Sequence, residues 1–527
     1  MADTKREIER KFEFTQAKPA RHGVPDLTGT AAIAAVRDQG TVDLDAVYYD
    51  TPDQRLAADG LTLRRRTGGP DAGWHLKLPV SPGVRDEIGA ELGDTVPRPL
   101  AALVRSRVRG APLEPQIRIL SSRRVSHLLD AEGTLLAELS TDTVRAERGE
   151  ATATWTEVEV ELADGVGPEL LDEVEKTFRK AGLEVSASPS KLARALAETG
   201  TAPAARPGGE GSAAGSRSDA GSGAGPGSDA GSDGTAGAYV LAYLRAQRDT
   251  LVSQDPAVRR GLPDSVHRMR VACRRLRSAF KTYRTVLDRD ATDPIGEELR
   301  WLATELGVDR DQEVLLDRIQ THLDALPSPL LHGPVHARLH TWNATRRTES
   351  RRRVTAALDS PRHLALLDSL DALLDAPPLR KAARGRPRRV LPKAVLRDRR
   401  RLADRIGAAL ALAEGPERDL ALHEARKAAK RARYAAEAAV PALGKPAKRL
   451  AKAMKSVQSL LGEHQDGVVA RDALHGLARQ ADGAGESAFT WGVLYAREEA
   501  LAARAEQDLP RVWETAGDPR LGSALRR

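Results

Sequence analysis

The sequence predicts a multi-domain protein with an α+β N-terminal domain and an all-α C-terminal domain. Segments of period-2 alternation dominate the first 200 residues, as in antiparallel β-structure. Helical patterns rich in Ala, Leu and Arg run from Tyr239 to the end of the chain. Between them, residues 201–237 are almost entirely Gly, Ala, Ser, Pro and Asp, which is typical of a flexible linker. We therefore assign 1–200 and 238–527 to two domains joined by a linker at 201–237.

Composition narrows the class of protein. The chain has 527 residues, of which 41% are hydrophobic and 3% aromatic, so aliphatic residues build its cores. Cys273 is the single cysteine and excludes an internal disulfide. No apolar run reaches the roughly 18 residues of a membrane span, and the N-terminus has no apolar signal region. We therefore expect a soluble, cytoplasmic protein without membrane contact.

The charge is unevenly divided between the two domains. Residues 238–527 hold 53 Lys or Arg against 37 Asp or Glu, a balance of +16. The remaining residues hold 29 against 37, a balance of −8. A polyanion partner, if the protein has one, is therefore expected on the C-terminal domain. Nucleic acid is disfavoured, because the aromatic residues needed to stack bases are scarce and no helix-turn-helix signature is evident.

The N-terminal domain is expected to form many short antiparallel strands. The predicted strands lie at 7–14, 46–50, 61–66, 74–79, 84–88, 114–120, 135–144 and 154–162. Helices are expected near 27–38, 98–108 and 168–182. Many antiparallel strands at short spacing indicate a barrel or a strongly curved sheet.

Several of these strands carry charge on one face. The charged faces hold Glu7, Glu9 and Lys11; Arg64 and Arg66; His75 and Lys77; Arg85 and Glu87; Glu157, Glu159 and Glu161; and Arg118 with Arg123 or Arg124. A solvated face explains one such strand. Five or more such strands favour a closed barrel with a charged interior. In such a barrel carboxylates hold Mg²⁺ or Mn²⁺, and Arg and Lys side chains hold phosphoryl oxygens.

The N-terminal domain resembles the CYTH family, the triphosphate tunnel metalloenzymes, over roughly residues 4–200. Its ExExK signature is present at Glu7–Lys11. The later pieces of the family pattern follow in order, and they are Tyr48-x-Asp50-Thr51, Gly60-x-x-Leu-Arg64-x-Arg66, Lys77, Arg85-x-Glu87, Asp142, Glu157-x-Glu159-x-Glu161 and Ser190-Lys191.

The resemblance implies an eight-stranded antiparallel tunnel that hydrolyses or cyclises triphosphate groups with a divalent metal. It implies Glu7 and Glu9 as metal-facing residues together with two of Glu157, Glu159 and Glu161, and the pattern leaves open which two. It implies catalytic roles for Glu7, Glu9, Lys11 and Glu159. The implied phosphate-binding residues are Lys11, Arg64, Arg66, Lys77, Arg85, Arg118 and Lys191.

The C-terminal domain contains an internal repeat that preserves a line of cations. His267, Arg270, Arg274 and Arg277 recur as His423, Arg426, Lys430 and Arg433, with the same offsets of one helical stripe. Each copy is followed by a Leu-Gly motif, at 306–311 and at 461–466, in which His464 takes the place of Asp309. A basic stripe is usually a solvated face, but duplication of the His-Arg pattern favours phosphate binding.

This half resembles the CHAD family, a histidine-containing helical domain that often follows a CYTH domain. The resemblance implies two pseudo-symmetric four-helix bundles around a basic groove that binds inorganic polyphosphate. The residues expected to bind it are His267, Arg270, Arg274, Arg277, Lys281, His423, Arg426, Lys427, Lys430, Arg433 and His464.

The function expected first is a metal-dependent triphosphatase acting on inorganic triphosphate or a related compound, with a polyphosphate-binding module. A catalytically weak polyphosphate-binding protein that serves for localisation, for example at polyphosphate granules, is the main alternative. A class IV-type adenylate cyclase is a further alternative, because such cyclases share the tunnel. The sequence does not indicate an oligomeric state.

Overall fold

The computed structural model describes residues 4–15, 23–200 and 234–526. The chain divides into two compact units, Met1–Gly225 and Pro226–Arg527. Residues 201–233 of the predicted linker lie outside the described residues. The first helix of the second unit, α5, spans Ala236–Arg260, so its first two residues take up the end of the predicted linker.

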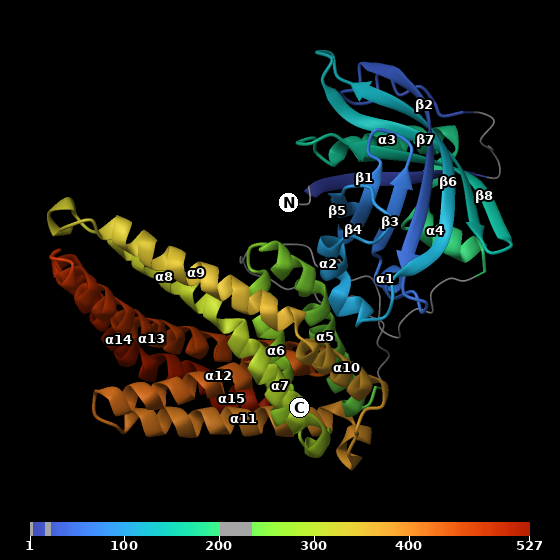
Figure 1. The fold of residues 1–527 in the computed structure, drawn as a ribbon. Helices are drawn as coiled ribbons and strands as arrows, with labels where there is room; N and C mark the ends of the chain where they lie inside the picture. The colour runs from blue at the N-terminus through green and yellow to red at the C-terminus, as the bar shows by residue number, and fades with distance from the viewer. Residues whose placement is uncertain (1–3, 16–22, 201–233, 527) are drawn as a thin grey trace. The chain divides into compact units, whose positions relative to one another are not determined.

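The strands of the first unit form a closed antiparallel barrel (Figure 1). They are β1 (Thr4–Phe14), β2 (Ala35–Asp50), β3 (Thr62–Thr67), β4 (Gly73–Ser81), β5 (Val84–Ala90), β6 (Glu114–Leu129), β7 (Leu135–Arg148) and β8 (Ala151–Leu162). They are hydrogen-bonded in the order β5-β4-β3-β2-β6-β7-β8-β1, and β1 pairs back to β5. A short strand, β9 (Leu183–Val185), pairs with the end of β1. The predicted eight-stranded barrel is confirmed.

Helices cover apolar residues on the outside of this barrel. Helix α3 (Glu169–Ala181) packs on β1, where the rings of Phe12 and Phe178 meet edge-on at 4.7 Å. Helix α2 (Arg98–Val108) shares a core with Leu63, Trp74 and Leu76 of β3 and β4. A single turn, α1 (Arg55–Ala58), joins that core through Leu56. The period-2 alternation therefore sends one set of side chains outward to these helices and the other set inward.

One end of the barrel interior is apolar and lies under helix α4 (Lys191–Glu198). Leu192 and Leu196 of α4 pack in one cluster with Ile119 of β6 and Trp155 of β8. The helix starts at Ser190, whose side chain accepts a hydrogen bond from the backbone N–H of Ala193 at 3.1 Å. Helix α4 therefore places its first residue at the boundary between the apolar and charged parts of the interior.

The prediction of a helix near 27–38 was wrong. Leu27 and Ile33 are buried, but 28–32 form turns in which Gly29 has a φ of 82°. From Ala35 onward the chain is strand β2, which pairs with β6. Strand pairing along the long β2–β6 ladder overrides the local helical preference.

The second unit is all-α, as predicted. Its first half consists of α5, α6 (Ser265–Thr282), α7 (Arg289–Glu305), α8 (Gly307–Asp324), α9 (Val335–Asp359) and α10 (Pro361–Asp375), with a 3₁₀ turn, η2, at Ser328–Leu330. Its second half consists of η3 (Lys381–Arg384), α11 (Pro387–Leu410), α12 (Pro416–Leu443), α13 (Lys445–Gly483), α14 (Phe489–Ala516) and α15 (Pro519–Ser523). Two hydrophobic clusters hold the unit together, and each joins helices from both halves.

The internal repeat appears as the matching helices α6 and α12, which pack against each other (Figure 1). The Leu-Gly motifs are placed differently. Leu306 lies at the break between α7 and α8, whereas Leu461 lies inside the unbroken helix α13. Across the described residues, no helix has the length and apolar character that crossing a membrane requires.

Candidate functional site

Strand register gathers the charged residues of seven strands inside the barrel. Lys11 lies opposite Glu159, Lys77 lies opposite Glu87, and residues directly opposite share a face. The charged interior includes Glu7, Glu9, Lys11, Arg64, Arg66, His75, Lys77, Arg85, Glu87, Arg123, Asp142, Glu157, Glu159 and Lys191. We call this set the tunnel.

Three buried carboxylates form the acidic centre of the tunnel. Asp142, Glu157 and Glu159 each place an oxygen within 4.8 Å of the others. The Lys191 ammonium lies among them, at 2.7 Å from Asp142 Oδ2, 2.7 Å from Glu157 Oε1 and 2.6 Å from Glu159 Oε1. Three carboxylates around one ammonium make a site that stabilises positive charge.

Arg123 of β6 closes this centre from a second side. Its Nε and one terminal nitrogen donate to the two oxygens of Asp142, both at 2.8 Å. The same terminal nitrogen donates to Glu159 Oε2 at 2.7 Å. This two-point contact fixes the plane of the Asp142 carboxylate.

Lys11 connects the acidic centre to the first strand. Its ammonium contacts Glu159 and also lies 3.2 Å from Glu9 Oε2. Arg85 reaches the other oxygen of Glu9 at 2.8 Å. Burial acts to raise the pKa of Glu9, but Lys11 and the other nearby cations outweigh it and hold the pKa below its ordinary value. Glu9 is therefore ionised at neutral pH.

Glu7 has a different environment from its neighbour. Lys77 Nζ lies 2.7 Å from Glu7 Oε2 and 2.9 Å from Glu87 Oε2. Burial raises the pKa of Glu7 to about 7, with Lys77 opposing the shift and Glu87 adding to it. In contrast, Lys11, Lys191 and Arg123 together overcome burial and hold the pKa of Glu159 well below its usual range.

Arg64 and Arg66 project from β3 into the same interior. Burial and the neighbouring Arg64 lower the pKa of Arg66 to about 9. Arg64 lies 3.9 Å from Glu87, and Arg66 forms an ion pair with Asp71 at the β3–β4 turn. Two adjacent guanidinium groups are a favourable arrangement for binding phosphoryl oxygens.

One residue expected in the site lies elsewhere. Arg118 occupies the outer face of β6, where its side chain is 50% exposed and pairs with Asp45 at 2.9 Å and 2.6 Å. Arg123 supplies the β6 cation of the tunnel instead. Glu161 lies opposite Glu9 on the inward face of β8, but it is half-buried and pairs with Lys5 at 2.6 Å, apart from the acidic centre that contains Glu157 and Glu159.

The acidic centre fits a hard divalent cation. Its donor set consists of carboxylate oxygens alone, which Mg²⁺ and Mn²⁺ prefer. The position already holds one cationic group, the Lys191 ammonium, at hydrogen-bond distance from all three carboxylates. A metal at this centre requires that Lys191 move to another anionic partner, such as a phosphoryl oxygen.

The second candidate site lies between α6 and α12, where matching arginines contact their own Leu-Gly motifs. Arg270 donates to the carbonyl oxygen of Gly307 at 3.3 Å. Arg426 lies over Gly462, where an added Cβ would come within 3.4 Å of the guanidinium, and it pairs with Asp466 at 3.3 Å. Gly462 therefore leaves room for Arg426, and Gly307 accepts a hydrogen bond from Arg270 through its carbonyl oxygen.

Four cations face one another here, namely Arg270, Arg274, Arg426 and Lys430, and we call this set the groove. Burial, Arg426 and Arg274 lower the pKa of Lys430 to about 7 against the opposing effect of Asp466, and Arg270 adds to the lowering. Within the described residues, the Nε atoms of Arg274 and Arg426 are buried without a hydrogen-bond partner. Repelling cations with unsatisfied donors favour the binding of an anion.

The other residues of the two stripes are spread along the helices. His267 is half-buried one turn before Arg270, and His423 makes a hydrogen bond with Gln465 through Nδ1. Lys427 pairs with Glu424 at 2.7 Å, and Arg433 pairs with Glu437 at 2.6 Å. Arg277 and Lys281 lie further along α6.

His464 is not in the groove. It is buried with Nε2 at 3.2 Å from Asp419 and 3.0 Å from Glu506, between α12 and α14. Its neighbours Gln465 and Asp466 reach the His/Arg helix instead, and both sit in the Leu-Gly motif that the sequence had marked.

Two family models match the chain, one for the CYTH domain over residues 5–196 and one for the CHAD domain over residues 242–475. Uncharacterized protein MT2285 of Mycobacterium tuberculosis (strain CDC 1551 / Oshkosh) is 38% identical over 522 residues, which is 95% of this chain and 94% of that protein. Uncharacterized protein Rv2226 of strain ATCC 25618 / H37Rv matches to the same extent.

Solved structures give weaker similarities. PptA from Streptomyces chartreusis is 24% identical and covers 53% of this chain and 99% of its own, with a TM-score of 0.45. The putative adenylyl cyclase HpAC1 from Hippeastrum, whose structure is described as revealing a dominant triphosphatase activity, is 20% identical. It covers 36% of this chain and 95% of its own, with a TM-score of 0.23.

Proposed function

Because the chain belongs to the family of proteins in which a CYTH domain precedes a CHAD domain, we propose that it is a divalent-metal-dependent triphosphatase that also binds inorganic polyphosphate. CYTH domains carry out phosphate chemistry that depends on divalent metals. The proposed substrate is inorganic triphosphate or a related triphosphate compound. The observation that carries the proposal is the tunnel, where buried carboxylates and buried cations lie side by side.

Phosphate binding falls to the tunnel cations. Arg64, Arg66, Lys77 and Arg85 line one side of the interior, and Lys11, Arg123 and Lys191 line the side next to the acidic centre. A triphosphate that lies between these groups has its negative charge neutralised and its chain held in line. Positioning and charge neutralisation supply most of the catalysis in phosphoryl transfer.

Asp142, Glu157 and Glu159 would hold the metal, with Glu9 beside them on β1. A bound divalent cation supplies Lewis-acid polarisation of phosphoryl oxygens. With a cation held there, Lys191 would pair with a phosphoryl oxygen of the substrate in place of a carboxylate oxygen, so the lysine would keep an anionic partner.

Glu7 is the carboxylate best suited to accept the proton of an attacking water. Its pKa of about 7 is matched to neutral pH, whereas the pKa of Glu159 is held far below it. Lys77 orients the Glu7 carboxylate from 2.7 Å. We therefore propose Glu7, oriented by Lys77, as the general base, and we keep Glu159 among the residues that would hold the metal.

One assay tests the enzyme proposal. Phosphate release is measured from triphosphate, ATP, thiamine triphosphate and long-chain polyphosphate, each with Mg²⁺, Mn²⁺ or EDTA. We expect release that requires a divalent cation and is fastest with inorganic triphosphate. Release that is equal in EDTA contradicts the metal assignment. Formation of cyclic AMP from ATP without phosphate release would instead identify a cyclase.

The helical unit is proposed to bind polyphosphate through the groove. Arg270, Arg274, Arg426 and Lys430 come from both copies of the repeat, so a linear polyanion laid between α6 and α12 contacts both helices. Titration of long-chain polyphosphate into the full chain in EDTA tests this. Absence of binding at low salt would refute it.

A further inference from the structure

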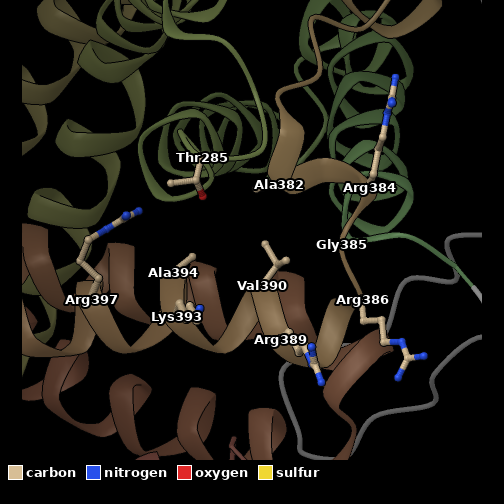
Figure 2. A pocket seen from close by; sticks show the side chains of 10 residues that line it. All are labelled: Thr285, Ala382, Arg384, Gly385, Arg386, Arg389, Val390, Lys393, Ala394 and Arg397. Carbon is tan, nitrogen blue, oxygen red and sulfur yellow. The ribbon is translucent and has the colours of Figure 1, made fainter.

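A cavity of about 730 Å³ lies in the helical unit between the segment after α6 and the start of α11. Figure 2 shows Val390 pointing into it from α11, with Thr285 and Arg397 on facing sides. The lining residues are Thr285, Ala382, Arg384, Gly385, Arg386, Arg389, Val390, Lys393, Ala394 and Arg397. Five of these ten residues are cationic and none is acidic.

The local sequence explains why the cavity is basic. Residues 380–397 contain eight Lys or Arg and no Asp or Glu. Arg389, Lys393 and Arg397 recur every fourth residue along one stripe of α11. The 24-residue helix α11 begins at Pro387, beside the cavity, so the partial positive charge of its N-terminus adds to the side-chain charge.

The turn before α11 is built for close packing. An added Cβ at Gly385 would come within 2.8 Å of Val390 and 3.1 Å of the Ala382 carbonyl oxygen. Glycine therefore allows η3 and α11 to meet and leave the cavity between them. The Gly385 carbonyl oxygen accepts a hydrogen bond from the backbone of Ala236 at 2.9 Å, so the cavity lies where α5 begins.

Further cations of α6 and α12, beyond the groove, lie close to this cavity. Lys281 of α6 has a pKa that burial, Arg277 and Arg431 all lower. Burial lowers the pKa of Arg431 in turn, as do the nearby Arg401, Arg397 and Arg284. Arg397 also donates to the Thr282 carbonyl oxygen at the end of α6. The line of cations therefore runs from α6 and α12 onto the cavity wall.

One carboxylate offsets this charge only in part. Asp398 accepts a hydrogen bond from Thr282 Oγ1 at 2.5 Å and lies 3.5 Å from Arg431 Nε. It acts on Arg397 and Arg431, which also have Arg284 and Arg401 as cationic neighbours. Such like-charge crowding costs free energy in the free protein and is relieved when a polyanion binds.

We propose that this cavity is a second phosphate-binding subsite, which holds the part of a polyphosphate chain that extends past the groove. The inference rests on the proposed polyphosphate binding of the helical unit and adds a subsite to it. Its ligand class is a run of phosphoryl groups, bound through Arg389, Lys393 and Arg397. A chain that reaches both places gains contacts that a short oligophosphate in the groove lacks.

The test uses the full chain with Arg389→Glu and Lys393→Glu. Both side chains are exposed, so charge reversal leaves the core intact. Arg352→Glu with Arg504→Glu is the control, because these arginines are exposed and lie outside the cavity lining. Binding of end-labelled long-chain polyphosphate is followed by anisotropy in EDTA at several salt concentrations, and binding of tripolyphosphate is followed by calorimetry.

We expect the cavity variant to lose at least about tenfold in long-chain affinity, with a slope of log K against log salt that is smaller by about 2. Its tripolyphosphate binding should match the wild type. If the cavity variant and the control pair lose the same affinity for long-chain polyphosphate, the proposed subsite is wrong, while the proposed groove is unaffected. Loss of a tripolyphosphate site with unchanged long-chain affinity overturns it too and makes the cavity a site for a separate small anion. If the wild type binds no polyphosphate of any length, the proposed function of the helical unit fails, and the subsite fails with it.

Discussion

In the tunnel Lys191 touches three carboxylates, whereas in the groove Lys430 is surrounded by arginines. Both lysines are largely removed from water, yet their pKa values move in opposite directions. The carboxylates outweigh burial and raise the pKa of Lys191, while burial and the arginines lower that of Lys430 to about 7. The molecule therefore contains two kinds of cationic site. In the tunnel the charge of the lysine is balanced by carboxylates, and in the groove it is opposed by neighbouring arginines.

The difference indicates two kinds of recognition. In the tunnel each cation has a counter-charge, so a triphosphate must replace existing ion pairs, and a metal at the carboxylates makes that exchange favourable. In the groove Asp466 pairs with Arg426 and only partly offsets the arginines around Lys430, so a long polyanion is attracted without a metal. Triphosphate turnover in the tunnel should therefore depend on the divalent metal and on individual carboxylates. Polyphosphate binding in the groove should depend on the salt concentration.

The largest expected effect is that of Glu9→Gln in the tunnel. The change keeps the side-chain volume but removes the charge that lies between Lys11 and Arg85. We expect triphosphate turnover to fall at least about a hundredfold, as when one preorganised electrostatic group is lost. Phosphate release with Mg²⁺ and Mn²⁺ measures the effect.

Glu184→Gln is the matched control, because Glu184 lies exposed on β9. It should leave turnover unchanged, and thermal melting should show that both variants are folded. Normal turnover in a folded Glu9→Gln protein would show that the tunnel does not use its first-strand carboxylates.

The groove should respond to paired substitution. Arg270→Ala with Arg426→Ala removes one cation from each copy of the repeat and should weaken polyphosphate binding roughly tenfold or more. The salt slope should fall by about 2, one unit for each lost phosphate contact. Arg352→Ala with Arg353→Ala, on exposed positions of α9, provides the comparison. Equal losses from both pairs would mean that diffuse charge, and no defined site, holds the polyanion.

Much of the tunnel could be predicted because β-strands alternate with a period of two. The charged residues of β1, β3, β4, β5 and β8 lie inside as the pattern predicted. Arg118 was misplaced for a specific reason. Its neighbours Ile117 and Ile119 resemble residues that pack outward against helices, yet they face an interior that is apolar beneath α4. The pattern of β6 alone does not reveal that a helix covers this end.

The groove was harder to predict residue by residue. The repeat identified Arg270 and Arg426, but the stripe also contains Arg433, which pairs with Glu437. His464 and Gln465 are neighbours in the same Leu-Gly motif, and the side chains of neighbouring residues point about 100° apart around a helix. His464 therefore points to Asp419 and Glu506 while Gln465 contacts His423. Only packing against a third helix separates these two positions.

The depressed pKa of Lys430 predicts a pH effect confined to the groove. In the free protein this lysine loses its charge as the pH rises through about 7, and a bound polyanion favours the charged form. Affinity for polyphosphate should therefore fall above pH 7, by up to about tenfold per pH unit. Lys430→Arg, which stays charged, should remove this dependence. A wild-type affinity that is flat from pH 6 to pH 9 would contradict it.

The smallest expected effect concerns Arg118, the cation that the sequence placed in the tunnel. Its half-exposed ion pair with Asp45 lies outside the barrel, and such surface pairs contribute about 0–1 kcal/mol. Arg118→Ala should therefore change triphosphate turnover by less than about twofold. Arg123→Ala, made on the same strand, removes contacts to Asp142 and Glu159 and should reduce turnover strongly. A large loss from Arg118→Ala together with a small one from Arg123→Ala would reverse the inward and outward faces assigned to β6.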